Sequence, residues 1–302
     1  MHTAQTFTKV RSDFASRGVR CNGDLYLPVG IQRPPVIVMA HGFASKRIFR
    51  LPAYAERFVQ RGLAVFLFDY RGFGDSDGEP RHLVDPRRHV EDWRAAAAHV
   101  RLLPTVDGSK LALWGTSFSG GHVIVLAAED PRVKAIVAQV PFVDPFALAH
   151  KPGIRYVLQV MGHGLWDLLK GLAGQSPHYV KVVGHPGEFA IMNTPEALPG
   201  YKSLLPNGAL WQNRCPARIL LSVLSYRPVA YADRVRCPAL VMYGQKDSLT
   251  SAAAVEKMAA RMANCVPVRL PFGHFEIYTG QGFEEAVDMQ ADFLTKHLQE
   301  KP

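Results

Sequence analysis

The chain has 302 residues, of which 48% are hydrophobic and 20% charged, and its 35 Lys and Arg against 26 Asp and Glu give a formal net charge of +9. This apolar share excludes intrinsic disorder, because burial can offset the entropy of ordering, and the 25 Gly and 22 Pro show no collagen-like period. The charge alone is compatible with a nucleic acid, a membrane surface or an anionic substrate.

Apolar runs alternate with amphipathic stretches along most of the chain. Alternation around Gly18 within residues 6–27 predicts an antiparallel hairpin at a sheet edge. The pattern then predicts strands at 36–40, 63–68, 110–114, 133–140, 239–243 and 266–270, and helices at 51–61, 86–102, 118–129, 250–263 and 282–298. Continuous apolar strands separated by helices indicate a parallel sheet that is covered on both faces.

The alternation stops between about residues 143 and 230. This segment is rich in Pro and Gly, holds an apolar helix candidate near 155–172 and has no strand that would extend the sheet. We predict a single α/β domain over residues 1–302, with residues 143–230 inserted as a cap over the carboxyl edge of the sheet. The helix candidate carries few charges, so we expect it to pack against the sheet edge and not on a lipid surface.

The cysteines predict neither a disulfide framework nor a metal site, because both need closely patterned spacing. The four are isolated, at Cys21, Cys215, Cys237 and Cys265. We expect free thiols, no metal and no cofactor.

Targeting signals are also missing from the sequence. The residues after Met1 lack the charged and apolar regions of a signal peptide, and no run reaches the ~18 apolar residues of a membrane span. We therefore expect a cytoplasmic protein without a membrane span. No nucleic-acid partner is expected, because no basic run with interleaved aromatic residues occurs.

Ser117 occupies the sharpest motif of the chain, between the strand at 110–114 and the helix at 118–129. The motif reads Gly115-Thr116-Ser117-Phe118-Ser119-Gly120-Gly121. A serine at a tight strand-to-helix turn projects its hydroxyl above the sheet edge, and small residues two positions before and after it let the turn close. The amino end of the following helix favours negative charge that develops at this place.

This turn resembles the nucleophile elbow of the α/β-hydrolase superfamily, in which the serine stands in Gly-x-Ser-x-Gly. Here Ser119 replaces the second glycine. The N-terminal hairpin and the loop at residues 69–78 resemble bacterial hydrolases near the dienelactone hydrolase and X-Pro dipeptidyl-peptidase-like groups. The resemblance implies the α/β-hydrolase fold: a mostly parallel central sheet with helices on both faces, an N-terminal antiparallel hairpin and an inserted helical cap.

The resemblance also implies an oxyanion hole. His41-Gly42-Phe43 follows the strand at 36–40, where this superfamily carries its oxyanion loop. The backbone N–H groups of Phe43 and Phe118 would then be the two donors.

An acid and a base arrive in the order that this superfamily uses. Asp247 follows the strand at 239–243, and His274 follows the strand at 266–270. A serine hydroxyl needs a base, an imidazole can accept and return its proton near neutral pH, and a carboxylate holds the imidazole tautomer. Asp144, at the end of the preceding strand, is an alternative acid, since some members place the acid there; its other interpretation is a turn cap.

The resemblance implies a serine hydrolase that cleaves a carboxylic ester through attack by Ser117 and an acyl-enzyme that water hydrolyses. A thioesterase or acyltransferase acting on a polyketide-type or other acyl intermediate is the alternative, because the same residues serve it. A non-catalytic binding protein of this fold is a minor alternative. The expected partner is a small-molecule ester or acyl substrate, with a homodimer as a further open alternative.

The expected cap bears on the substrate. Its apolar side chains, among them Leu158, Trp166, Met192, Tyr201 and Trp211, favour an apolar acyl or aromatic pocket beneath it. Residues 145–230 hold eight Lys or Arg against three Asp or Glu. This excess predicts a mildly electropositive entrance that favours anionic substrates.

Overall fold

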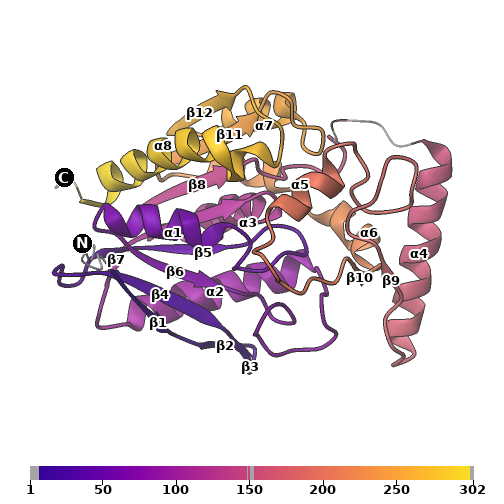
Figure 1. Ribbon diagram of the computed structural model, residues 1–302, viewed down its shortest axis with the longest axis horizontal. Coiled ribbons are helices and arrows are strands. Elements are labelled where there is room, and N and C mark those ends of the chain that lie inside the picture. The colour runs from indigo at the N-terminus through magenta and orange to yellow at the C-terminus, as the bar shows by residue number, and fades with distance from the viewer. Residues whose placement is uncertain (1–6, 148, 150–152, 300–302) are drawn as a thin grey trace.

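A computed structural model describes residues 7–147, 149 and 153–299 of the chain (Figure 1). The residues after Met1 on which the signal-peptide expectation rests lie outside this range. Eight strands form the central sheet. In their order across the sheet they are β1 (Phe7–Arg11), β4 (Gly23–Pro28), β6 (Ala64–Phe68), β5 (Pro35–Ala40), β7 (Asp107–Thr116), β8 (Ala135–Gln139), β11 (Ala239–Gly244) and β12 (Cys265–Leu270).

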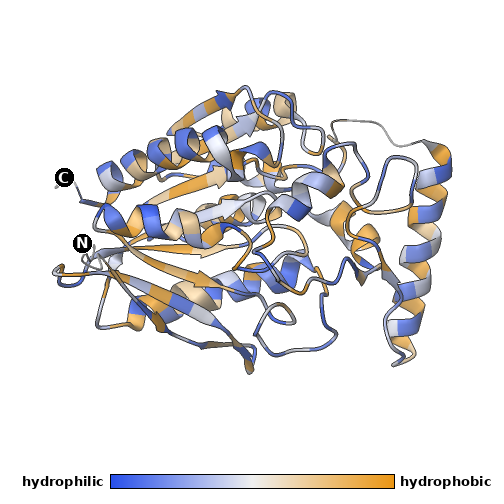
Figure 2. Cartoon of the chain, viewed as in Figure 1, coloured by the Kyte–Doolittle hydropathy of each residue, from blue (hydrophilic) through white to orange (hydrophobic). Residues whose placement is uncertain are grey.

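In this order, the strands from β6 to β12 run parallel to one another. At one edge, β4 pairs antiparallel with both β1 and β6. A separate hairpin of β2 (Phe14–Ser16) and β3 (Val19–Cys21) closes at Arg17 and Gly18, where both residues have positive φ. The mostly parallel sheet and its antiparallel N-terminal edge are therefore confirmed. Most apolar runs predicted as strands are buried strands of this sheet, several of which Figure 2 shows in orange, whereas β12 forms the other edge and is largely exposed.

Helices cover both faces of this sheet (Figure 1). They are α1 (Leu51–Gln60), α2 (Pro86–Leu102), α3 (Phe118–Glu129), α7 (Ala252–Ala259) and α8 (Gly280–Gln299). Helices α1 and α8 pack against each other, and α2 packs against α3. The start of α2 illustrates the local cause: Asp85 accepts hydrogen bonds from the backbone N–H groups of Arg87 and Arg88, with Pro86 at the first helical position.

Among the described residues between β8 and β11, no strand joins the central sheet. It contains α4 (Ile154–Leu172), β9 (Tyr179–Val180), α5 (Ala197–Ser203), β10 (Cys215–Pro216), α6 (Ile219–Ser222) and the short 3-10 helices η1 (Val223–Ser225) and η2 (Pro228–Arg234). Strands β9 and β10 pair only with each other. We refer to residues 143–230 as the inserted segment.

The expectation that the apolar helix packs against the sheet edge is wrong. Helix α4 lies at the end of the molecule, away from the sheet, and contacts α6 (Figure 1). Only Gly164 and Asp167 of α4 are buried, and most of its apolar side chains are exposed. Within the described ranges, no helix is both long and apolar enough to span a membrane.

Candidate active site

Ser117 stands at the turn from β7 to α3 with the strained backbone angles φ 55° and ψ −119°. The backbone is held there because Ser117 N–H donates to the Gln139 carbonyl (2.8 Å) and its own carbonyl accepts from Phe142 N–H (2.9 Å). A Cβ on Gly115 would lie 2.3 Å from the Ser119 carbonyl oxygen, so the turn requires glycine there. At Ser119 a hydroxyl is accommodated, since its Oγ is hydrogen-bonded to the buried Tyr70 hydroxyl (3.0 Å).

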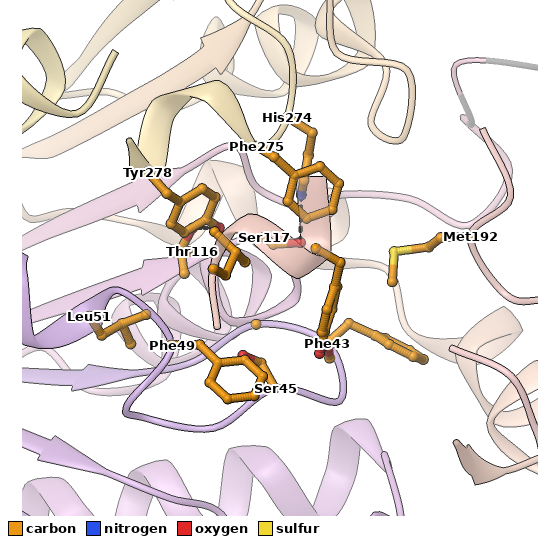
Figure 3. Close-up of a pocket in the computed structure, with 13 residues that line it drawn as sticks. Phe43, Ser45, Phe49, Leu51, Thr116, Ser117, Met192, His274, Phe275 and Tyr278 are labelled. Atoms are coloured by element: carbon orange, nitrogen blue, oxygen red, sulfur yellow. Dashed lines mark hydrogen bonds between the residues drawn. The ribbon is translucent and has the colours of Figure 1, made fainter. Parts of the chain in front are cut away.

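The structure brings Ser117, His274 and Asp247 together, although they are far apart in the sequence. His274 Nε2 lies 3.0 Å from Ser117 Oγ, as the dashed line in Figure 3 shows, and His274 Nδ1 lies 2.7 Å from Asp247 Oδ2. Asp247 also accepts hydrogen bonds from the backbone N–H groups of Leu249 and Thr250 (2.8 Å each) and from the Thr250 hydroxyl (2.7 Å). The carboxylate is thereby fixed in one orientation toward the imidazole.

The electrostatics of this contact favour the charged forms of both groups. Burial alone would raise the pKa of Asp247, but the neighbouring imidazole and the hydrogen bonds lower it. Burial alone would lower the pKa of His274, but the charge and hydrogen bond of Asp247, with a smaller contribution from the Glu196 charge, raise it. An imidazolium that forms at His274 is thus stabilised inside the protein.

Asp144, the alternative acid, lies in different surroundings. Its carboxylate accepts from Phe146 N–H (3.0 Å) and from the Arg227 guanidinium (2.8 Å), and this pairing lowers its pKa against the opposing effect of burial. The contact with His274 Nδ1 is made by Asp247. The geometry therefore favours Asp247 as the acid that orients the imidazole of His274.

The loop after β5, which carries Phe43, lies directly against Ser117. A Cβ on Gly42 would be 3.0 Å from Ser117 Cβ and 3.1 Å from the Thr116 carbonyl oxygen, so a larger residue there would push the loop away from the turn. The rings of Phe43 and Phe118 meet edge to face with centroids 5.4 Å apart. The two residues expected to form the oxyanion hole are thus neighbours across the elbow.

A narrow pocket opens beside Ser117 and His274 (Figure 3). Its apolar lining includes Phe49, Leu51 and Phe275, and hydroxyl groups of Ser45, Thr116 and Tyr278 also face it. Tyr278 belongs to the 3-10 helix η3 (Glu276–Tyr278), and its hydroxyl is hydrogen-bonded to that of Thr116. The pocket suits an apolar group with a few polar contacts near the serine.

The inserted segment contributes Met192, Tyr201 and Leu204 to this pocket. Other apolar side chains expected to form it, such as Leu158 and Trp166, are exposed on α4 instead. The Tyr201 hydroxyl donates to the Phe43 carbonyl (3.1 Å), which ties the segment to the loop after β5.

The expected electropositive entrance stays a prediction. None of the thirteen lining residues is Lys or Arg. Three basic residues of the inserted segment form ion pairs, Arg218 with Asp167 (2.7 Å), Lys181 with Glu188 (2.9 Å) and Arg227 with Asp144 (2.8 Å).

Glu196 is a site residue that no sequence motif marks. Its Oε1 accepts from Ser248 N–H (2.7 Å), and its Oε2 accepts from His274 N–H (3.0 Å). A lone carboxylate in the irregular inserted segment carries no pattern from which this contact could be read. Only the folded chain places it between the loops that carry Asp247 and His274.

The part of the chain that the structure describes contains no group of side chains suited to binding a metal ion. In residues 7–147, 149 and 153–299, no three His, Cys, Asp or Glu side chains are grouped so as to hold a metal ion. The four cysteines are free thiols, and burial raises the pKa of Cys237 and Cys265 to about 11.

Comparisons with known proteins agree over most of the chain. A family model described as "Serine aminopeptidase, S33" matches residues 32–270. The chain is 40% identical over 283 residues to the quorum-quenching protein AidA of Acinetobacter baumannii, covering 94% of this chain and 93% of that protein. It is 31% identical over 287 residues to the polyketide transferase af380 of Aspergillus fumigatus, covering 93% and 95%.

Solved structures extend the likeness to the fold. The crystal structure of the alpha/beta hydrolase GrgF from Penicillium sp. matches with a TM-score of 0.82 and 26% identity, and the match covers 97% of this chain and 100% of that one. The similarity therefore includes the inserted segment as well as the sheet.

Proposed function

Because the chain belongs to the serine aminopeptidase S33 family of the α/β-hydrolase superfamily, we propose that it is a serine hydrolase that cleaves a carboxylic ester. The observation that carries the proposal is the hydrogen-bonded series from Ser117 through His274 to Asp247 beside an apolar pocket. A serine, a base within hydrogen-bond reach and a carboxylate that orients the base are what nucleophilic acyl transfer needs.

The first half-reaction forms the acyl-enzyme. Ser117 Oγ attacks the carbonyl carbon while His274 Nε2 takes its proton, and Asp247 stabilises the imidazolium. The N–H groups of Phe43 and Phe118 bind the oxyanion of the tetrahedral intermediate. When the intermediate collapses, the bond to the leaving oxygen breaks and His274 returns the proton to the departing alcohol.

The second half-reaction releases the acid. Water takes the place of the alcohol, and His274 accepts one of its protons as its oxygen attacks the acyl carbon. The bond to Ser117 Oγ breaks, and the proton on His274 restores the serine hydroxyl. The products are one carboxylic acid and one alcohol, with one water consumed.

The inserted segment serves as a cap in this scheme. Met192, Tyr201 and Leu204 close one side of the pocket, and the Tyr201 hydroxyl holds the Phe43 carbonyl. The mostly apolar lining beside the nucleophile favours an apolar acyl or aryl group there.

Acyl transfer from a thioester is the second candidate. It is favoured by the likeness to proteins named polyketide transferases, of which the one from Aspergillus fumigatus is 31% identical over 93% of this chain. The same acyl-Ser117 intermediate would form, with a thiol as the leaving group and an alcohol, thiol or water as the acceptor.

Labelling with a fluorophosphonate probe followed by peptide mass spectrometry tests the nucleophile. We expect the label on Ser117 and a loss of ester turnover of at least about 10⁴-fold in Ser117→Ala. Label on another residue, or turnover that survives in Ser117→Ala, contradicts the proposal.

A matched pair of substrates separates the two candidates. An oxygen ester and a thioester of the same short acyl group are compared by kcat/KM, with and without an added acceptor alcohol. A higher kcat/KM for the ester, with the free acid as the main product, supports ester hydrolysis. Preference for the thioester together with transfer to the acceptor supports the second candidate.

A further inference from the structure

Helix α4 presents a regular apolar row to the solvent. The row consists of Ile154, Leu158, Met161, Leu165, Leu168 and Leu172, which we call the α4 seam. Each of these side chains is between 40% and 79% exposed. Their spacing alternates strictly between four and three residues, which is the a and d spacing of a helix that packs lengthwise against another helix.

The opposite face of α4 is already occupied, so the seam is held outward. Asp167 is buried and bound to the Arg218 guanidinium (2.7 Å), and it also accepts from the backbone N–H groups of His178 (2.7 Å) and Arg218 (2.8 Å). A Cβ on Gly164 would lie 2.7 Å from Leu221 Cγ, which shows how closely α4 and α6 approach. Turning the seam inward would break a buried ion pair, at considerable cost.

The seam is too large to be an incidental surface. With the flanking Val157, Trp166 and Leu169, which are also exposed, it amounts to on the order of 800 Å² of apolar surface. The largest apolar patch on a typical monomer is about 300–600 Å². One partner in a stable protein interface buries about 800 Å².

We propose that the α4 seam docks against the α4 seam of a second copy of this chain, as an antiparallel helix pair in a twofold homodimer. A twofold pairing makes the same patch serve both copies. Antiparallel pairing also places Arg155, at the amino end, near the negative carboxyl end of the partner helix.

The charges of α4 favour a second copy over a lipid surface. A helix that lies on a membrane carries several Lys or Arg on its polar face. Helix α4 carries Arg155 and Lys170 at opposite ends, together with Asp167, which is paired internally.

Light scattering after size exclusion, on the full chain at tens of micromolar, tests the pairing. We expect twice the chain mass for the natural protein and the single-chain mass for the double variant Leu158→Glu with Leu165→Glu. The control is Leu102→Glu with Leu210→Glu, which changes two leucines that lie off the seam and are more exposed, and it should remain dimeric.

Three outcomes overturn the proposal. One is a natural protein of single-chain mass, and another is a control that dissociates as readily as the seam variant. The third is a single-chain protein that binds phosphatidylglycerol vesicles and loses this binding in the seam variant, which would make a membrane the occupant. Far-ultraviolet circular dichroism confirms that each variant is folded, and single substitutions at Leu158 or Leu165 replace the double variant if it is not.

Glu196 carries a second, independent inference, which rests on the proposed function. Its carboxylate joins the two loops that present Asp247 and His274: one oxygen holds Ser248, directly after the acid, and the other holds the backbone N–H of the base. The Ser248 hydroxyl lies 2.5 Å from the same Glu196 oxygen. The geometry assigns Glu196 as a positioning residue through which the inserted segment holds Asp247 and His274 in place.

The neighbourhood of His274 explains why a carboxylate suits this place. Asp247 faces one ring nitrogen and Ser117 the other, while Glu276 accepts from Gly273 N–H (2.6 Å). Glu196 adds a negative charge near an imidazole that becomes positive during the reaction.

The test compares Glu196→Gln and Glu196→Ala with the control Glu188→Gln, a carboxylate of the same segment that pairs with the exposed Lys181. We expect kcat to fall about tenfold in Glu196→Gln and further in Glu196→Ala. The acid limb of kcat/KM should move to lower pH in both, because a charge that favours the imidazolium is gone. The control should match the natural protein.

Natural kcat and an unmoved acid limb in both Glu196 variants would overturn this assignment. So would a uniform loss of activity without movement of the acid limb, since a merely structural role predicts it. If Ser117→Ala itself retains turnover, the proposed function fails instead, so the two failures are distinguishable.

Discussion

The carboxyl edge of the central sheet, where Ser117 lies, and the inserted segment differ in the contacts that hold their residues in place. At the sheet edge, Arg47 joins the buried Asp69 and Asp24, and Arg71 joins the buried Asp92 (2.5 Å). These pairs tie the loop after β5 to β4 and to the loop after β6, and they tie the loop after β6 to helix α2. The edge is therefore preorganised, as a catalytic centre requires.

The inserted segment is joined to that edge by aromatic packing, such as that of Tyr226 on Phe118, and by individual polar contacts. Tyr201 binds the Phe43 carbonyl, and Glu196 binds Ser248 and His274. Its strands have two residues each, and its longest helix leaves its apolar face exposed. In the function that we propose, the chemistry belongs to the preorganised edge, whereas the inserted segment shapes the pocket and presents the α4 seam to a second copy.

Replacing the two candidate acids gives the largest contrast between the regions. Asp247→Asn should lower kcat about 10⁴-fold, because the wrong imidazole tautomer would face Ser117. Asp144→Asn, at the start of the inserted segment, should change kcat by less than about threefold, since it loses only an exposed ion pair. Steady-state ester kinetics measure both, and a large loss in Asp144→Asn alone would move the acid into the segment.

Two glycine substitutions compare the rigidity of the regions. A Cβ on Gly74 would lie 2.1 Å from the buried Asp69 carboxylate, at a positive φ of 49°, so Gly74→Ala should cost about 3 kcal/mol of unfolding free energy. Gly162 of α4 has open space around it, so Gly162→Ala should add about 0.5–1 kcal/mol. Urea unfolding measures both, and equal effects would remove the contrast.

Acidification should lower kcat/KM through protonation of His274 at the sheet edge. Its pKa is raised above the usual 6.5, so the imidazole becomes protonated, and unable to accept the Ser117 proton, at a higher pH than usual. We expect kcat/KM to fall tenfold per pH unit below a midpoint above 6.5. A midpoint below 6.5 in the pH profile would contradict the influence of Asp247.

Salt should give the smallest effect, through the charge of the inserted segment. If its basic residues attract substrate, a rise from 0.05 to 0.3 M salt should lower kcat/KM for a carboxylate-bearing ester about twofold and leave a matched neutral ester unchanged. The ion pairs of Arg218, Lys181 and Arg227 keep the expected change small. If the ratio of kcat/KM for the two esters does not change with salt, the expected preference for anionic substrates is contradicted.

Much of the sheet and its loops could be predicted because their patterns are local. A buried parallel strand must be continuously apolar, and a serine turn must be flanked by small residues. For this reason β5, β7 and the turn at Ser117 can be recognised in the sequence. The order of Ser117, Asp247 and His274 follows from the order of the strands that precede them.

The exposure of α4 could not be predicted, for a physical reason. An apolar stripe specifies that a helix needs a partner, but the stripe is the same whether the partner is the sheet or a second copy. The burial of Asp167 with Arg218, two residues brought together by the fold, decided which face of α4 turns inward.

The α/β architecture, the nucleophile candidate and the order of its partners can be read from the sequence, because they depend on periodicity and on turn chemistry within a few residues. The folded chain was needed to show that Asp247, and not Asp144, meets His274, that Glu196 binds the loops that carry Asp247 and His274, and that the α4 seam faces solvent. Those contacts join residues that are distant in the chain, and a distance in space leaves no local pattern in the sequence.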